Sequence, residues 1–120
     1  MINQYELPVY LVNELPEIED DLKETSKTLN VFKTVQCLVH YTKESIKAHD
    51  MNAVKRIMNA VEGIYMKGNN AVKNAFENVF VYSFTSMICM CDREEKNHLQ
   101  AIMPLHLYSA YILQVYRSGN

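Results

Sequence analysis

The sequence contains little glycine and proline: together they account for six of its 120 residues. This is about half of the usual share, and it excludes collagen-like chains, Gly/Ser-rich linkers and all-β folds with many turns. Intrinsic disorder is excluded as well, because 48% of the residues are hydrophobic and the net charge is only −2. We therefore predict an all-α protein, a compact bundle of five or six helices in a single domain over residues 1–120.

The sequence also lacks a long apolar run and an export signal. Its most apolar stretch, residues 79–91, is 13 residues long and is interrupted by Ser83, Thr85 and Ser86, whereas a membrane-spanning helix needs about 17–25 apolar residues. Residues 1–6 are polar and acidic, unlike the basic start and apolar centre of a signal peptide. We therefore expect a cytoplasmic protein without a membrane partner. The odd number of cysteines, three, predicts reduced thiols.

Apolar residues at helical spacing and recognisable helix ends divide the chain into segments. Asp50 is a predicted N-cap, Gly68 a predicted helix end, and Asp92 with Glu95 a predicted capping box. We expect a short turn near the N-terminus, a helix from Pro16, and helices over residues 28–48, 51–67, 70–91 and 92–102 and from Pro104 onward. The helix from Thr28 is expected to bury Val31, Phe32, Val35, Leu38, Val39 and Ile46.

The fourth helix of this series is expected to lie at the centre of the bundle. Residues 80–91 are apolar on all sides, and such a helix is normally surrounded by other helices. Val79, Val81 and Tyr82 also fit a strand, but no second strand is predicted that could pair with it. The sequence therefore predicts a largely buried fourth helix.

Charge is distributed unevenly along the chain. Residues 1–24 hold seven acidic residues and one basic residue, a net charge of −6, so residues 25–120 carry +4. We expect the acidic segment, residues 1–27, to pack on the bundle or flank it, either against the basic helices or as an anionic surface for a basic partner. Weak nucleic-acid binding through the basic middle helices is an alternative, which the isoelectric point of about 6.1 disfavours.

Residues with catalytic or metal-binding chemistry are sparse. Cys37 and His40 share a helix face, which leaves an enzyme or metal-binding protein as a second alternative, but two ligands do not make a site. Cys89 and Cys91 point about 200° apart on a helix and are expected to be buried small residues. No nucleophile motif or glycine-rich phosphate loop is present. We therefore expect no enzyme, no cofactor, and no catalytic, cofactor-binding or metal-binding residues.

The three remaining histidines stand alone in the sequence pattern. His49, His98 and His106 fall at predicted helix ends or on polar faces. A lone histidine in such a place is normally a capping or solvent-exposed residue. We therefore assign none of them to a catalytic site.

The last helix has an apolar face that is wider than one interface requires. Its apolar and aromatic residues span about 180°, against roughly 100° for a helix that packs on one side. Leu105, Ile112 and Tyr116 are expected to serve the core, so that Leu107 and Tyr111 are left for a protein partner, unless the helix packs between two neighbours. The predicted interaction surface comprises Leu107, Tyr108, Tyr111, Glu17, Asp20, Asp21 and Glu24.

Residues 67–119 resemble a family of small, uncharacterised, all-helical bacterial proteins. The similarity is carried by residues 68–83 and 105–108, together with Tyr111, Gln114, Val115, Ser118 and Gly119. It implies a stand-alone bacterial domain of unknown function, and no catalytic motif accompanies it. We therefore predict a non-enzymatic protein-interaction domain with an unknown protein partner, either an immunity-like protein that neutralises its partner or a homo-oligomer such as a homodimer.

Overall fold

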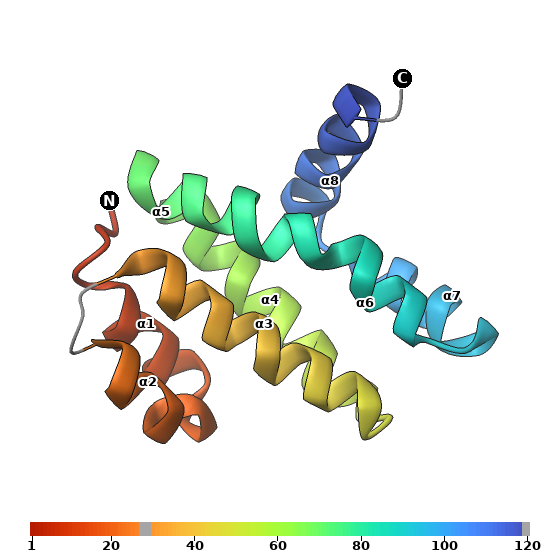
Figure 1. The fold of residues 1–120 in the computed structure, drawn as a ribbon, viewed down its shortest axis with the longest axis horizontal. Helices are drawn as coiled ribbons and strands as arrows, with labels where there is room; N and C mark the ends of the chain where they lie inside the picture. The colour runs from red at the N-terminus through yellow and green to blue at the C-terminus, as the bar shows by residue number, and fades with distance from the viewer. Residues whose placement is uncertain (27–29, 119–120) are drawn as a thin grey trace.

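The structure, a computed structural model, describes residues 1–26 and 30–118 (Figure 1). Its helices are α1 (Leu7–Glu14), α2 (Glu19–Ser26), α3 (Val31–Lys47), α4 (Met51–Lys67), α5 (Asn70–Ala75), α6 (Phe84–Met90), α7 (Arg93–Ile102) and α8 (Leu105–Ser118). A 3-10 turn, η1 (Pro16–Ile18), leads into α2, whereas a π-helical turn, η2 (Phe76–Phe80), and a 3-10 turn, η3 (Val81–Ser83), join α5 to α6. Residues 70–90 thus form one rod, here called the long helix. The predicted all-α class is confirmed.

The N-terminal segment contains more helix than the sequence pattern predicts. Residues 7–14 form α1 rather than a short turn, so the bundle has more helices than the five or six expected. Leu7, Leu11 and Leu15 recur at a spacing of one helical turn and are fully buried. Burial of this leucine stripe supplies the stability that so short a helix lacks on its own.

The described part of the acidic segment lies against the bundle. Helix α2 packs on α3, and α1 contacts α4. Ile2 is held at the corner between α4 and the long helix: its N–H donates to the Lys67 carbonyl at 2.8 Å, and its carbonyl accepts from the Asn69 N–H at 2.8 Å. The N-terminal end of the chain is therefore hydrogen-bonded directly to the corner at residues 67–69.

The predicted helix ends are confirmed where the structure describes them. Asp50 accepts from the Ala53 N–H at 3.1 Å, and Asn69 caps the long helix. Asp92 and Glu95 form the predicted capping box. The predicted start at Thr28 lies outside the described residues. Helix α3 begins at Val31 and is capped by Asn30, whose side-chain oxygen accepts from two backbone N–H groups.

The long helix is buried on one side only, which corrects the expected central position. Phe76, Phe80 and Phe84 form a column with ring centroids 6.2 and 5.5 Å apart in edge-to-face geometry. The opposite side faces solvent, and Tyr82 is 76% exposed there. Among the described residues, the neighbouring helices cover only the phenylalanine side of the long helix.

Two further burial predictions are wrong for the same geometric reason. Cys91 is buried as expected, but Cys89 lies on the open side of the long helix and is exposed. Phe32, placed in the buried stripe of α3, is also exposed. A periodic pattern identifies the apolar side of a helix, but the neighbours decide how far that side is covered.

Helices α7 and α8 complete the bundle. Helix α7 packs on α4, where Leu99 is fully buried. Helix α8 contacts α4 and η3, and its C-terminal end projects from the rest of the molecule (Figure 1). Within the described ranges, none of the helices combines the length and the apolar character that a bilayer crossing requires.

We predict opposite effects of alanine at two glycines. Gly63 lies within α4, and an added Cβ would meet no atom within 4 Å, so Gly63→Ala should raise the free energy of unfolding by about 1 kcal/mol. At Gly68 an added Cβ would lie 2.6 Å from Cγ1 of the buried Val72. Gly68→Ala should therefore lower the free energy of unfolding by about 1–3 kcal/mol. Urea unfolding measures both, and equal effects at the two sites would contradict the packing described.

Candidate functional site

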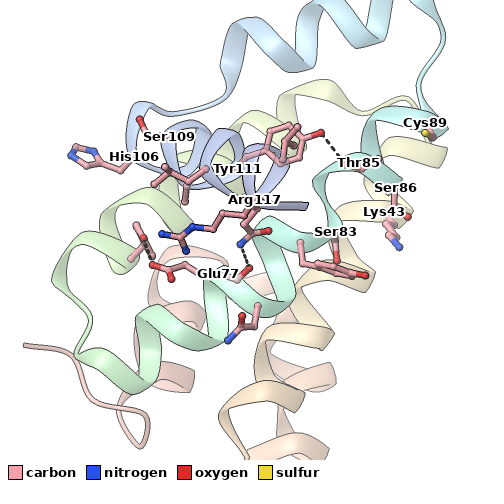
Figure 2. A pocket seen from close by; sticks show the side chains of 17 residues that line it. Lys43, Glu77, Ser83, Thr85, Ser86, Cys89, His106, Ser109, Tyr111 and Arg117 are labelled. Atoms are coloured by element: carbon pink, nitrogen blue, oxygen red, sulfur yellow. Dashed lines mark hydrogen bonds between the residues drawn. The ribbon is translucent and has the colours of Figure 1, made fainter. Parts of the chain in front are cut away.

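A large open groove runs between α8 and the long helix (Figure 2). Its volume is about 1220 Å³. We call it the α8 groove and define it by the following lining residues: Lys43, Tyr65, Glu77, Asn78, Tyr82, Ser83, Thr85, Ser86, Cys89, His106, Ser109, Ala110, Tyr111, Leu113, Gln114, Val115 and Arg117. The groove is thus built mainly from the open side of the long helix and from α8.

The position of α8 is set by one carboxylate from α4. The Glu62 side chain accepts from the Leu107 N–H at 3.1 Å and from the His106 N–H at 3.0 Å. The same carboxylate lies 3.0 Å from the His106 ring Nδ1. Backbone N–H groups in the first turn of a helix have no partner within the helix, and the helix dipole favours an anion there. Glu62 therefore acts as an N-terminal cap from another helix and fixes both the start and the rotation of α8.

Further polar contacts join three helices along one side of the groove. The Tyr65 hydroxyl donates to the Glu77 carboxylate at 2.5 Å, and the Gln114 amide donates to the Glu77 carbonyl at 2.7 Å. Burial raises the pKa of Tyr65, and the hydrogen bond to Glu77 and the charges of Glu77 and Glu62 raise it further. Tyr65 is consequently a hydrogen-bond donor at all physiological pH values.

The rotation of α8 corrects the prediction for its two faces. Leu107, which is part of the predicted interaction surface, is fully buried, so its assignment to an accessible surface is wrong. Leu105 and Tyr116, assigned to the core, are exposed at 71% and 76%. The Glu62 cap turns the side of α8 that carries Leu107 and Tyr111 toward the bundle. A helical wheel gives the angle between these residues but not the direction of the bundle.

The two tyrosines of the predicted surface have different positions. Tyr108 is exposed. Tyr111 is half-buried: its ring lies 5.6 Å from the Phe84 ring, and its hydroxyl is 2.9 Å from the Thr85 hydroxyl (Figure 2). Tyr111 therefore forms part of the groove wall and also links α8 to the phenylalanine column.

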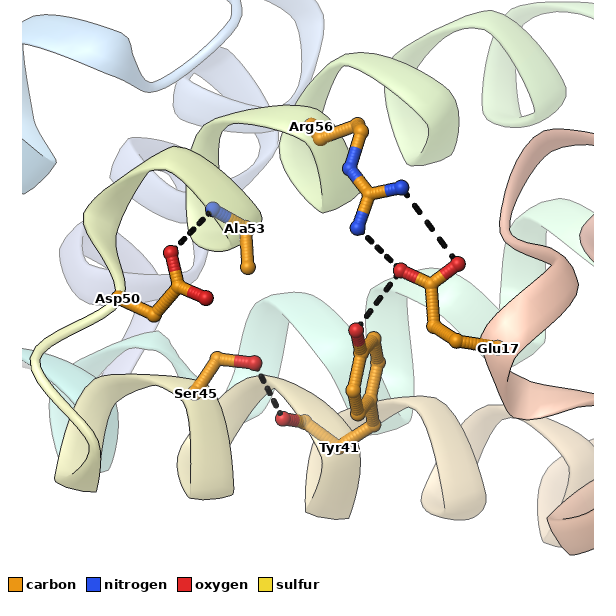
Figure 3. Close-up of polar contacts among 6 residues, drawn as sticks. All are labelled: Glu17, Tyr41, Ser45, Asp50, Ala53 and Arg56. Carbon is orange, nitrogen blue, oxygen red and sulfur yellow. Dashed lines mark hydrogen bonds and ion pairs between the residues drawn. The ribbon is translucent and has the colours of Figure 1, made fainter.

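Glu17 of the predicted acidic surface is engaged within the molecule. It comes from η1 and accepts from the Tyr41 hydroxyl at 2.8 Å and from the Arg56 guanidinium (Figure 3). Burial alone would raise the pKa of Glu17, but hydrogen bonds from its own backbone, Tyr41 and Arg56 and the Arg56 charge together lower it. These contacts clamp the acidic segment onto α3 and α4.

The other acidic residues lie apart from the α8 groove. Asp20 and Asp21 are exposed on α2, and the Asp20 carboxylate lies 3.6 Å from the Lys23 ammonium. The side chain of Glu24 lies outside the described residues. The structure therefore does not bring the acidic and aromatic halves of the predicted surface together.

Cys37 and His40 do not meet a third ligand. Cys37 is half-buried on α3, where burial and then the Asp21 charge raise its thiol pKa, and His40 is exposed. The described ranges hold no cluster of three or more His, Cys, Asp or Glu residues arranged to bind a metal ion. Because a metal ligand or nucleophile must be the thiolate, the raised pKa makes Cys37 poorly suited to either role.

His49 and His106 have carboxylate partners that the sequence pattern did not reveal. The His49 Nδ1 lies 2.6 Å from the Glu95 carboxylate, which belongs to the capping box of α7. The hydrogen bond to Glu95 and then its charge raise the pKa of His49. In both pairs the two residues are more than 40 positions apart in the sequence. Such long-range pairs produce no local sequence signal.

A family comparison agrees with the predicted resemblance. Residues 8–117 match the sequence model of a family described as Domain of unknown function (DUF7674). The chain belongs to this family. The match covers the bundle from α1 to the end of α8, well beyond residues 67–119 on which the resemblance was based. No curated protein and no solved structure matches the chain. The predicted bacterial origin stays a prediction.

We predict that Glu62→Ala loosens α8. Loss of the cap leaves two backbone N–H groups without their acceptor, which should lower the free energy of unfolding by about 1–2 kcal/mol. Amide hydrogen exchange in the first turn of α8 should accelerate more than exchange in α3. Asn59→Ala, at an exposed position of the same helix, is the control and should leave both unchanged. Unchanged exchange in α8 of the Glu62→Ala variant would rule out the capping role.

The clamp at Glu17 predicts a dependence of stability on acid. Because its folded pKa lies below the ordinary value of 4.5, Glu17 stabilises the fold fully above that value, and the stabilisation is lost as pH falls through the lowered pKa. The stability difference between wild type and Glu17→Gln should therefore shrink in acid, as measured by urea unfolding at several pH values. Asp20→Asn, at an exposed site, should show little difference throughout. A difference that widens in acid would contradict this assignment.

Proposed function

We propose that this protein acts by binding another polypeptide in the α8 groove and not by catalysis. The observation that carries the proposal is a group of exposed apolar side chains along the groove: Tyr82, Leu113 and Val115 are 76%, 55% and 44% exposed. Exposed apolar side chains that line one groove together with polar residues are typical of protein-binding sites. Tyrosine is also enriched in such interfaces.

The polar groups of the groove support binding over catalysis. Glu77 accepts from Tyr65, His106 lies against Glu62, and Tyr111 lies against Thr85. A general acid or base must exchange a proton with a substrate, whereas these groups hold helices together. Their contacts make the groove rigid, and a rigid groove loses less conformational entropy when a partner binds.

A photo-crosslinking experiment tests this proposal. Tyr82 is replaced by benzoylphenylalanine in the full chain, and the control carries the same replacement at Tyr10, an exposed tyrosine on α1 outside the groove. We expect light-dependent adducts with protein from position 82 and not from position 10. Val115→Glu in the opposite wall should abolish these adducts while the circular dichroism spectrum stays helical. Equal adducts from both positions, or none from position 82, would contradict the proposal.

A further inference from the structure

Both walls of the α8 groove lack charge over long stretches. The lining residues within 78–89 and 106–115 include no Asp, Glu, Lys or Arg, although such residues make up 22% of the chain. Several side chains in these stretches are exposed, among them Tyr82, Tyr108, Leu113 and Val115. The cores of protein interfaces are depleted in charged residues in the same way. Because these side chains are exposed, burial in the core does not explain why charged residues are missing from these stretches.

We propose that the occupant of the α8 groove is a second copy of this chain, so that two copies form a symmetric dimer through α8 and the open side of the long helix. This inference rests on the proposed protein-binding function and names the partner. In a two-fold dimer the same patch of each copy meets near the axis. A patch of one charge would there repel its own copy, whereas the lining residues within 78–89 and 106–115 include no Asp, Glu, Lys or Arg. The charged lining residues, Lys43, Glu77 and Arg117, lie outside these stretches and are of both signs.

The polar side chains of the walls are also suited to pairing with themselves. Tyr82, Ser86 and Ser109 line the groove and carry hydroxyl groups. A hydroxyl both donates and accepts hydrogen bonds, so two copies of one hydroxyl can pair across a two-fold axis. Ammonium and carboxylate groups cannot pair with their own kind in this manner. The N-terminal segment, with its net charge of −6, is the least suitable surface for self-association.

The size of the patch sets the strength of the dimer. Helix α8 has 14 residues and is thus about 21 Å long. A single helix of this length with one neighbouring wall gives an interface at the small end of the range for specific complexes. The dimer should therefore dissociate reversibly on dilution and not behave as an obligate assembly.

The mass of the purified full chain in solution tests the dimer. Sedimentation equilibrium from about 1 μM to 1 mM should show a rise from the monomer mass of 13.9 kDa toward twice that mass. Tyr82→Glu or Val115→Glu places two carboxylates near the axis and should raise the dissociation constant at least about tenfold. Tyr10→Glu, an exposed position outside the groove, should leave it unchanged. Circular dichroism and melting temperature establish that each variant is folded.

Two results would overturn the dimer. One is a monomer mass at all concentrations, and the other is a dimer that Tyr82→Glu and Val115→Glu leave intact. Failure of the dimer is distinguishable from failure of the proposed function, because the crosslinking at position 82 identifies the adduct by mass. A monomer with adducts to a different protein keeps the groove as a binding site and removes self-association. A monomer without adducts removes both.

Discussion

The shape of the candidate site depends on the contact between the Glu62 carboxylate and the first turn of α8. This contact determines where α8 begins and which of its sides faces the bundle. It buries Leu107 and leaves Leu113 and Val115 accessible. The groove is therefore a consequence of one helix being oriented by a side chain of another, 45 residues earlier in the sequence. Hydrophobic burial holds the helices together, but the partly buried Glu62 carboxylate decides the rotation of α8 relative to α4.

The remainder of the bundle provides a rigid base for this arrangement. The phenylalanine column of the long helix packs into the interior, and Tyr111 extends the column to α8. At the other end, Glu17 clamps the acidic segment to α3 and α4 through Tyr41 and Arg56 (Figure 3). The local excess of negative charge is thus partly neutralised within the molecule. Along the α8 groove, by contrast, apolar surface stays accessible at Tyr82, Leu113 and Val115.

Local signals in the sequence predicted the fold class and most helix ends. Caps such as Asp50 and Asp92 act within a few residues, so their effect can be read from the sequence. Such local signals could not predict which side of α8 and which side of the long helix is buried. Leu107 and Leu105 are equally apolar, and only the long-range contact with Glu62 distinguishes the buried one from the exposed one. Cys89 and Tyr82 are exposed because no helix within residues 1–26 and 30–118 covers them, and the apolar pattern of a helix does not show whether a neighbour is present.

The π-helical turn Phe76–Phe80 makes the sides of the long helix tolerant of a one-residue change in its length. Such a turn holds one residue more than an α-helical turn does. It takes up the extra residue locally, so deletion of a single residue there would restore regular α-helix while Tyr82 and Phe84 keep about their present directions. A one-residue indel in the regular α-helical parts would instead rotate every following side chain by about 100° about the axis. The π-helical turn is thus the place in the long helix where one residue can be gained or lost without exchanging the binding surface.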